Sequence, residues 1–527
     1  MRFGRENMIK KLFNELTMCA RFALGLKGFV QEKLTFEQAR MDIKERLEGR
    51  RENFLKLVKK GIFEYKLSPY LPLFKSSNYV FSDVEKMVDK NGIEGALKIL
   101  KDDGIFFTIQ EFKSREKDFD NPYIAACYET RTAGTRSAGT RVAVDFHYFS
   151  QVAANKGLMV DAWGLSGFPL IIIRPAFPFG SGMKIMLTLS KFGIYPEKFI
   201  SPLEAKGLSF RNRLGVAYIM NMGNFFGAKF KKPEYIDFNN IHKIIEIIDG
   251  FNKKHGKCLV ATNVSSAVRI CLAAKDKGID LKGVVFRGGG EPMTPDRLKV
   301  IEERGAIYIL SYSFCEAGGA VGFLCTKPAA IDDVHLFKDF LTIISYRKDV
   351  SGRQVDAFLA TSLLPSAPKI LLNVENGDHG VIEDRECGCP YGRLGYNTHI
   401  HDIRSFEKLT GEGMTFYGAD LIQIMENVLP ARFGGSALEY QIVEEKDENG
   451  IARLVILVAP AVGPIDENEL IKTVLDELGK GNDSSRMMAD LWARLSVVKV
   501  RRSAPFVTKA GKMYPLHIDQ RRGYEDR

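Results

Sequence analysis

One short polar run of this chain has residue types and spacing that suit phosphate binding. The run "TAGTRSAGT", residues 132–140, places Gly134 and Gly139 among several hydroxyl side chains. Backbone amides and hydroxyls in such a loop can donate hydrogen bonds to phosphate oxygens. The spacing matches the first half of a P-loop, but Thr140-Arg141 stands where a P-loop requires Lys followed by Ser or Thr. Taken alone, the run fits either a phosphate loop or a polar surface turn.

Two further segments place small residues and a carboxylate directly after apolar runs. The segment "FRGGGEPMT" (286–294) follows "GVV", and "LSYSFCEAGG" (310–319) follows "AIYI" and carries Glu316. Consecutive strand-to-helix loops of a parallel sheet reach the same carboxyl edge, where α/β proteins bind ligands. Asp378 in "NGDHG", Arg404 in "HDIRSFEKLTGEG" and Lys512 in "TKAGKMYP" come later in the chain. Each of these three is unremarkable alone, because Asp and Gly-flanked Lys are common in turns.

The elements that would position these residues follow from hydrophobic periodicity. Residues 1–65 are rich in Lys, Glu, Leu and Phe and are predicted to be helical. From about residue 120, the apolar runs "RVAVDF", "LIII", "CLVATN", "GVVFRGGG" and "AIYILSYS" alternate with helical segments, which predicts βαβ units and a largely parallel sheet. After residue 405 we predict a helix at "ADLIQIMENVLP", a hairpin turning at Asn449-Gly450, and a helix at "DENELIKTVLDELG".

In their order along the chain, these segments resemble the motifs of the adenylate-forming superfamily of acyl-CoA synthetases, adenylation domains and luciferases. The run at 132–140 is similar to that superfamily's phosphate loop, "GGGEP" to its adenine-side loop, and "YSFCEAGG" to its Tyr-Gly-x-Thr/Ser-Glu motif. "NGDHG" is similar to its ribose-binding segment, "IRSFEKLTGEG" to its hinge, and "PFVTKAGKM" to its C-terminal lysine motif. The resemblance spans roughly residues 50–515 and is strongest to the phenylacetate-CoA ligase and capsule-protein-like branch.

The resemblance implies an α/β fold in two domains. A large N-terminal adenylation domain of mixed, largely parallel sheets flanked by helices would span 1–403, including the helical segment 1–65. A hinge at 404–407 would join it to a small mobile α+β lid domain at 408–527.

It also implies a two-step reaction, in which a carboxylate attacks the α-phosphate of ATP and a thiol then displaces AMP from the acyl-adenylate. The implied cofactors are ATP and Mg²⁺, with CoA as co-substrate. Glu316 would hold Mg²⁺, Arg404 would support ribose or phosphate, and Lys512 would bridge the α-phosphate and the attacking carboxylate. The implied nucleotide-binding residues are Thr132, Gly134, Thr135, Ser137, Gly139 and Thr140 for the phosphates, Gly289, Gly290, Glu291 and Tyr312 for adenine, and Asp378 for ribose.

Cysteines provide a second set of candidates. "ECGCPYGR" holds Cys387 and Cys389 and resembles a Cys-x-Cys-Gly-Arg element of the phenylacetate-ligase-like proteins, which implies Cys325 and His335 as partners. Three thiolates and one imidazole would form a closed tetrahedral site for a structural Zn²⁺. The alternatives are that these cysteines are ordinary core residues, or that His255 and Cys258 form a metal-binding pair.

Composition limits the partners. The net charge of +10 suits an anionic small ligand, and without a basic stripe interleaved with aromatics we expect no nucleic-acid binding. We expect no transmembrane segment, because the apolar run "GFPLIIIRPAFPFG" is shorter than the ~20 residues of a membrane span. We expect a cytoplasmic protein, because Asn14, Glu15 and Arg21 interrupt the apolar run that a signal peptide needs. The apolar stripe of the first helix fits either a membrane surface or packing on its own domain.

The acid itself is poorly specified by the sequence. The aromatic- and Met-rich segment 145–230 predicts a pocket for an apolar or aromatic acid, although these residues could simply fill the core. The expected acceptor is CoA, with a carrier protein, a protein thiol or nucleotidylation of a cofactor as alternatives. A non-catalytic nucleotide-binding protein is the alternative of another class, and a homodimer is one option for the assembly.

Overall fold

The computed structural model describes most of the chain. The described residues are 2–131, 141–176, 180–202, 210–350, 353–406, 408–411, 414–417, 423–447, 451–480, 483–506 and 516–518.

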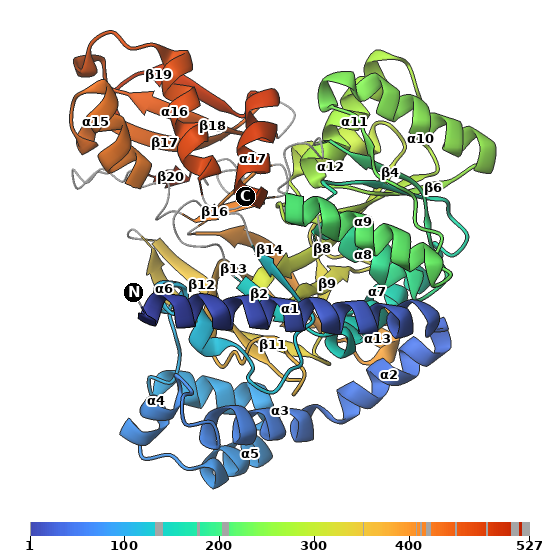
Figure 1. The fold of residues 1–527 in the computed structure, drawn as a ribbon, viewed down its shortest axis with the longest axis vertical. Helices are drawn as coiled ribbons and strands as arrows, with labels where there is room; N and C mark the ends of the chain where they lie inside the picture. Colours follow the sequence, from blue (N-terminus) through green and yellow to red (C-terminus); the bar gives the residue numbers. More distant parts are fainter. Residues whose placement is uncertain are drawn as a thin grey trace.

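Helices form the N-terminal part, as the sequence predicts. They are α1 (Arg2–Gln31), α2 (Phe36–Glu48), α3 (Arg50–Val58), α4 (Leu71–Ser76), α5 (Phe81–Asp102) and α6 (Ile109–Ser114), so the helical region continues beyond residue 65. Thr35 and Gln38 form a reciprocal capping box that starts α2. In Figure 1 the long helix α1 crosses in front of the sheet region, with α3, α4 and α5 gathered below it.

A sheet of twelve strands forms the centre of the protein, in the order β11-β12-β13-β14-β10-β9-β8-β7-β6-β3-β4-β5. Its β5 to β8 part is parallel, and every pairing from β8 to β11 is antiparallel. The parallel strands are β5 (Glu234–Tyr235), β4 (Pro196–Ser201), β3 (Leu170–Ile173), β6 (Cys258–Ala261), β7 (Val284–Gly289) and β8 (Ile307–Phe314). The others are β9 (Gly319–Leu324), β10 (Val334–Leu336), β11 (Leu341–Val350), β12 (Arg353–Ser362), β13 (Val374–Asp384) and β14 (Thr398–Ser405).

The predicted βαβ alternation is confirmed in the parallel part. Every residue of β3 and β6 is buried, as expected for parallel strands that read as continuous apolar runs. Helix α8 (Ser181–Ser190) packs on β3, α10 (Ile241–His255) on β6, α11 (Val264–Asp276) on β7 and α12 (Pro295–Glu302) on β8. Helix α7 (Phe146–Ala162) contacts α2, α8 and β9, and α9 (Phe210–Phe225) lies beside α1.

A second, separate sheet lies in the C-terminal lobe, coloured orange to red in Figure 1. Its order is β19-β18-β17-β20, from β17 (Tyr440–Lys446), β18 (Ala452–Val458), β19 (Val498–Arg502) and β20 (Leu516–Ile518). The hairpin β17–β18 confirms the predicted one, and its turn at 449–450 lies outside the described residues. The lobe's helices are α15 (Leu429–Phe433), preceded by a π-helical turn at Ile424–Val428, α16 (Glu467–Gly479) and α17 (Asp483–Arg494).

The two lobes are connected through the region predicted as a hinge. Strand β14 continues through Ser405, so Arg404 belongs to the large sheet, and a two-stranded sheet of β15 (Lys408–Gly411) and β16 (Met414–Tyr417) follows. Glu407 lies outside the described residues. The position of the hinge and the domain limits remain predictions.

None of the helices in the described ranges combines the length and apolar character that a membrane crossing needs.

Candidate nucleotide site and cysteine-histidine cluster

Two of the predicted nucleotide loops leave the sheet side by side. Strands β7 and β8 are parallel neighbours with Gly289 opposite Ser311, so the loops that follow them lie at the same edge. Gly290 has φ +89°, a backbone conformation that favours glycine. A Cβ at Gly289 would lie 1.9 Å from the Ser311 carbonyl oxygen, so close strand packing requires glycine there.

Tyr312 and Asp378, which are predicted to contact adenine and ribose, belong to one hydrogen-bonded group. The Tyr312 hydroxyl donates to Asp378 Oδ2 at 2.9 Å, and the Ser405 hydroxyl donates to Oδ1 of the same carboxylate at 2.5 Å. Asn376 Nδ2 donates to the Tyr312 hydroxyl at 2.8 Å. Burial, and then the Asp378 carboxylate, raise the pKa of Tyr312 well above its usual value. The group therefore presents a carboxylate and a neutral phenol at the carboxyl end of β8.

Arg404 lies beside this group on β14. It pairs with His379 across the β13–β14 ladder, one position from the Asp378–Ser405 pair. Its guanidinium donates to Asp332 Oδ2 at 3.0 Å and to its neighbour's carbonyl, that of Ile403, at 2.7 Å. The predicted ribose-side residues from "NGDHG" and "HDIRSF" are thus neighbours in the sheet.

Glu316 lies in a short 3₁₀ turn, Cys315–Ala317, that directly follows β8. The residue is 6% exposed, and its Oε1 forms an ion pair with Lys113 Nζ of α6 at 2.5 Å. Burial raises the pKa of the adjacent Cys315 thiol to about 11, which keeps that thiol neutral at physiological pH.

The predicted phosphate loop lies outside the described residues, as do its candidates Thr132, Gly134, Thr135, Ser137, Gly139 and Thr140, but its two ends are described. The ends form an antiparallel pair, β1 (Tyr128–Arg131) and β2 (Arg141–Val144), and β2 contacts the turn that carries Glu316. Arg141 forms ion pairs with Asp120 and, at 2.6 Å, with Glu129. Arg141, which stands where a P-loop would have Ser or Thr, is therefore held in place at the start of β2.

Glu291 is bound within the protein. Its Oε2 accepts hydrogen bonds from the backbone N–H and hydroxyl of Ser265, at 2.8 and 2.6 Å, and lies 3.7 Å from Arg297 Nη1. Ser265 belongs to the first turn of α11, where a carboxylate interacts favourably with the helix dipole. The carboxylate thus joins the loop after β7 to α11.

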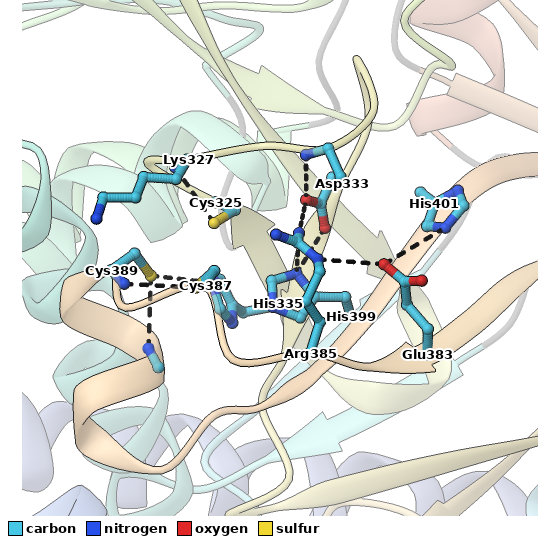
Figure 2. A network of polar contacts seen from close by, with 12 residues as sticks. Cys325, Lys327, Asp333, His335, Glu383, Arg385, Cys387, Cys389, His399 and His401 are labelled. Carbon is cyan, nitrogen blue, oxygen red and sulfur yellow. Dashed lines mark hydrogen bonds and ion pairs between the residues drawn. The ribbon is translucent and has the colours of Figure 1, made fainter.

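The four predicted zinc ligands converge. One ligand atom from each of Cys325, His335, Cys387 and Cys389 lies within 4.8 Å of the others. Figure 2 shows these residues grouped below Lys327 and Asp333, on segments that come from β9, β10 and the start of α13 (Pro390–Leu394). His335 Nε2 lies 3.1 Å from the Cys389 sulfur and 3.6 Å from the Cys387 sulfur.

The surroundings of this Cys–His cluster suit thiolate ligands. The backbone N–H groups of Lys327, Cys389 and Gly392 donate to the sulfurs of Cys325, Cys387 and Cys389, respectively. His335 Nδ1 lies 2.6 Å from the Tyr396 carbonyl oxygen, which fixes the ring so that Nε2 faces the sulfurs. A hydrogen bond with Cys325 and the proximity of His335 lower the pKa of Cys389. Three sulfurs and one imidazole nitrogen fit a tetrahedral zinc ion.

The alternative pair is arranged differently. His255 ends α10 on the surface, whereas Cys258 is buried in β6. Neither belongs to a candidate metal-binding group among the described residues.

A pocket of about 380 Å³ opens at the carboxyl ends of β3 and β4. Apolar side chains of α9 form one wall, and two cations, Arg213 and Lys232, line it together with Tyr235. Part of its lining comes from the segment predicted to hold the acid.

Comparisons with known proteins give matches by structure. No family model matches the sequence, and no curated protein does. A 2-hydroxyisobutyryl-CoA ligase, solved in complex with 2-HIB-AMP and CoA, shares the fold over 90% of both chains, with 13% identity and a TM-score of 0.58. An amide bond synthetase from Marinactinospora thermotolerans is also similar, with 15% identity over 74% of this chain and 68% of that chain and a TM-score of 0.41.

The chain has the fold of the adenylate-forming enzymes.

The structure places Gly289, Gly290, Tyr312 and Glu316 at the carboxyl ends of β7 and β8, with Asp378 of β13 hydrogen-bonded to Tyr312. Lys512 lies outside the described residues. Sequence reasoning missed the partners of these residues. The sequence position of Asn376, two residues before Asp378, could have indicated that it belongs to the site. Nothing in the sequence indicated Lys113, Ser405 and Asp332 as partners, because their contacts join distant parts of the chain.

Proposed function

We propose that this protein is an AMP-forming acid–thiol ligase of the adenylate-forming superfamily, similar to phenylacetate-CoA ligases. One observation carries the proposal: the Tyr312–Asp378 hydrogen bond joins β8 to β13, and the buried Glu316 lies in the turn after β8, which contacts strand β2 at the end of the predicted Thr- and Gly-rich loop. That arrangement offers a ribose acceptor, an aromatic ring and a metal-binding carboxylate within one site.

The residues present suit magnesium-bound ATP. Glu316 is a carboxylate in the turn that contacts β2, the strand after the predicted phosphate loop. Mg²⁺ prefers carboxylate and phosphate oxygens, and the ion would neutralise developing charge on the phosphates. Asp378 would accept ribose hydroxyls in exchange for its present donors, and Tyr312 would stack on adenine. Arg404 would contact ribose or phosphate, and Lys512 would bring a cation to the α-phosphate and the attacking carboxylate.

The expected thiol acceptor is CoA. The pocket beside α9 supports this choice, because Arg213 and Lys232 would attract phosphate groups and its apolar wall would contact an uncharged chain. The acid is proposed to be apolar or aromatic, held by the segment 145–230.

A structural zinc ion in the Cys–His cluster is the metal part of the proposal. The four ligands leave no open position for chemistry. Metal analysis of purified protein should give about one zinc per chain, and Cys387→Ser should reduce it. Folded wild-type protein without zinc would contradict this assignment.

Exchange of labelled pyrophosphate into ATP across a panel of acids tests the function. Apolar or aromatic acids should support exchange, and Lys512→Ala should abolish it. Adding CoA should then give the acyl-CoA thioester, whereas a thioester formed only with a carrier protein would identify that acceptor instead. No acid-dependent exchange with any acid would contradict the ligase proposal.

A further inference from the structure

The candidate metal carboxylate is already neutralised by a lysine from a distant segment. Lys113 and Glu316 are 203 positions apart in the chain, and their charged atoms are 2.5 Å apart. Their side chains are 16% and 7% exposed, so both charges are largely removed from water. A buried carboxylate without a counter-charge would cost several kcal/mol. Lys113 therefore stabilises the ionised form of Glu316 when no nucleotide is bound.

Nearby cations are held by other carboxylates. Lys369 Nζ contacts Asp120 Oδ1 at 2.7 Å and the Glu116 carbonyl oxygen at 2.8 Å, and its own side chain is fully buried. Arg141 is held by Asp120 and Glu129 at the end of the phosphate loop. Lys369 also interacts electrostatically with Glu316, but Lys113 forms a direct ion pair with this residue, which would bind Mg²⁺.

We propose that Lys113 is an exchangeable counter-ion that alternates between Glu316 and the triphosphate. In the nucleotide-free protein its ammonium occupies the place of the divalent cation. When Mg²⁺ and ATP bind, Glu316 takes the metal and Lys113 moves to a phosphate oxygen. This inference rests on the proposed role of Glu316 in the ligase reaction.

The chemistry of the two side chains fits this exchange. A lysine ammonium is a compact charge on a flexible four-carbon stem, so it can change partner without movement of α6. Each charge has an opposite charge before and after the exchange: Glu316 passes from an ammonium to a divalent cation, and Lys113 passes from a carboxylate to a phosphate. The phosphate loop has no lysine at the position that a P-loop requires, and Lys113 would supply that cation.

The test compares Lys113→Met with wild type in the full chain, using Mg²⁺ alone as the first probe. Mg²⁺ alone should leave the melting temperature of wild type nearly unchanged, because the ammonium competes for Glu316. It should clearly raise the melting temperature of Lys113→Met, in which Glu316 has lost its ion pair with the Lys113 ammonium. The affinity for Mg²⁺-ATP should fall by about tenfold or more, since a charged hydrogen bond to phosphate is lost. Lys117→Met, an exposed lysine on the same segment, should behave as wild type.

Two outcomes would overturn the inference. One is an identical response of Lys113→Met and wild type to Mg²⁺. The other is that Lys113→Met fails to fold with or without Mg²⁺ while the double variant Lys113→Met, Glu316→Gln folds, because the pair would then be purely structural. Folding of Lys113→Met only when Mg²⁺ is present would support the exchange.

These readouts need no acid substrate, so the inference and the proposed function can fail separately. Wild type without acid-dependent exchange, together with a Mg²⁺ response in Lys113→Met, would refute the ligase reaction alone. Normal exchange in wild type without that response would refute the counter-ion role alone.

Discussion

The Cys–His cluster and the nucleotide edge (Tyr312, Glu316, Asp378 and Arg404) lie on the same sheet. They differ in whether their candidate ligand groups lie together or are bound to other side chains. In the cluster, four ligand atoms already lie within 4.8 Å of one another, and each sulfur accepts a backbone hydrogen bond. At the nucleotide edge, the charged candidates are bound to other side chains of the protein: Glu316 to Lys113, Asp378 to Tyr312, and Arg404 to Asp332.

The cluster is therefore suited to holding a structural metal ion, whereas the nucleotide edge is suited to exchanging internal contacts for a ligand. A metal in the cluster would complete a preformed set of ligands on the antiparallel part of the sheet. A nucleotide at the proposed site would have to replace internal hydrogen bonds and ion pairs, and the loss of those contacts would reduce its binding free energy. Substitutions should therefore affect stability at the cluster and ligand binding at the nucleotide edge.

The largest expected effect on stability is at the cluster. Cys389→Ser removes a sulfur that lies 3.1 Å from His335 Nε2 and should abolish binding of the proposed metal. Because binding of a structural zinc contributes directly to folding, the free energy of unfolding should fall by on the order of 5 kcal/mol. Urea unfolding measures this free energy, and metal analysis measures the bound zinc. A metal-free variant as stable as wild type would show that the cluster does not stabilise the fold by binding a metal ion.

A smaller effect is expected from the buried charge of Lys369. Burial lowers the pKa of Lys369 to about 8 in the folded protein, against 10.5 for an ordinary lysine. Between these pH values the unfolded chain binds more protons, so the free energy of unfolding should rise with pH, by roughly 3 kcal/mol from this group.

Urea midpoints at pH 7.5 and 10 in wild type and Lys369→Met measure this contribution. The variant should lose that part of the rise, whereas Lys117→Met should keep it. An equal rise in wild type and Lys369→Met would contradict the assignment of the buried charge.

The smallest expected effect is at the contact between the two lobes. Arg494 of α17 donates to the Tyr235 hydroxyl at 2.7 Å and to Asp237 Oδ2 at 2.5 Å. The pair is partly exposed, so Arg494→Ala should cost about 1 kcal/mol or less. It should nevertheless increase the radius of gyration in solution scattering, because the contact joins the C-terminal lobe to the edge of the large sheet.

Arg432→Ala provides the matched control for this contact. It breaks an exposed ion pair with Glu469 inside the C-terminal lobe. An equal change in the radius of gyration for both variants would show that the contact between lobes does not hold them together.

Much of the parallel part of the fold could be predicted from the sequence. Buried parallel strands are continuous apolar runs, and "LIII" and "CLVA" are strands β3 and β6 as expected. The cluster was predicted through the resemblance to the phenylacetate-ligase-like proteins, which adds Cys325 and His335 to the closely spaced Cys387 and Cys389.

The antiparallel half and the partners of the site residues were not predictable in this way. Strands β11 to β13 carry buried polar residues such as Glu375, whose ion pair with Lys348 interrupts the simple apolar pattern. Contacts such as Lys113–Glu316 depend on how distant segments pack, and neither spacing nor periodicity encodes that packing.

Acid-dependent exchange of pyrophosphate into ATP in Glu316→Gln tests whether this carboxylate supports the proposed adenylation. Glu302→Gln, an exposed carboxylate on α12, serves as the matched control. With the best acid for wild type, Glu316→Gln should lose exchange by about a hundredfold or more, because it removes electrostatic stabilisation at the phosphates, while Glu302→Gln keeps it. Exchange in folded Glu316→Gln at the wild-type rate would show that Glu316 takes no part in adenylation.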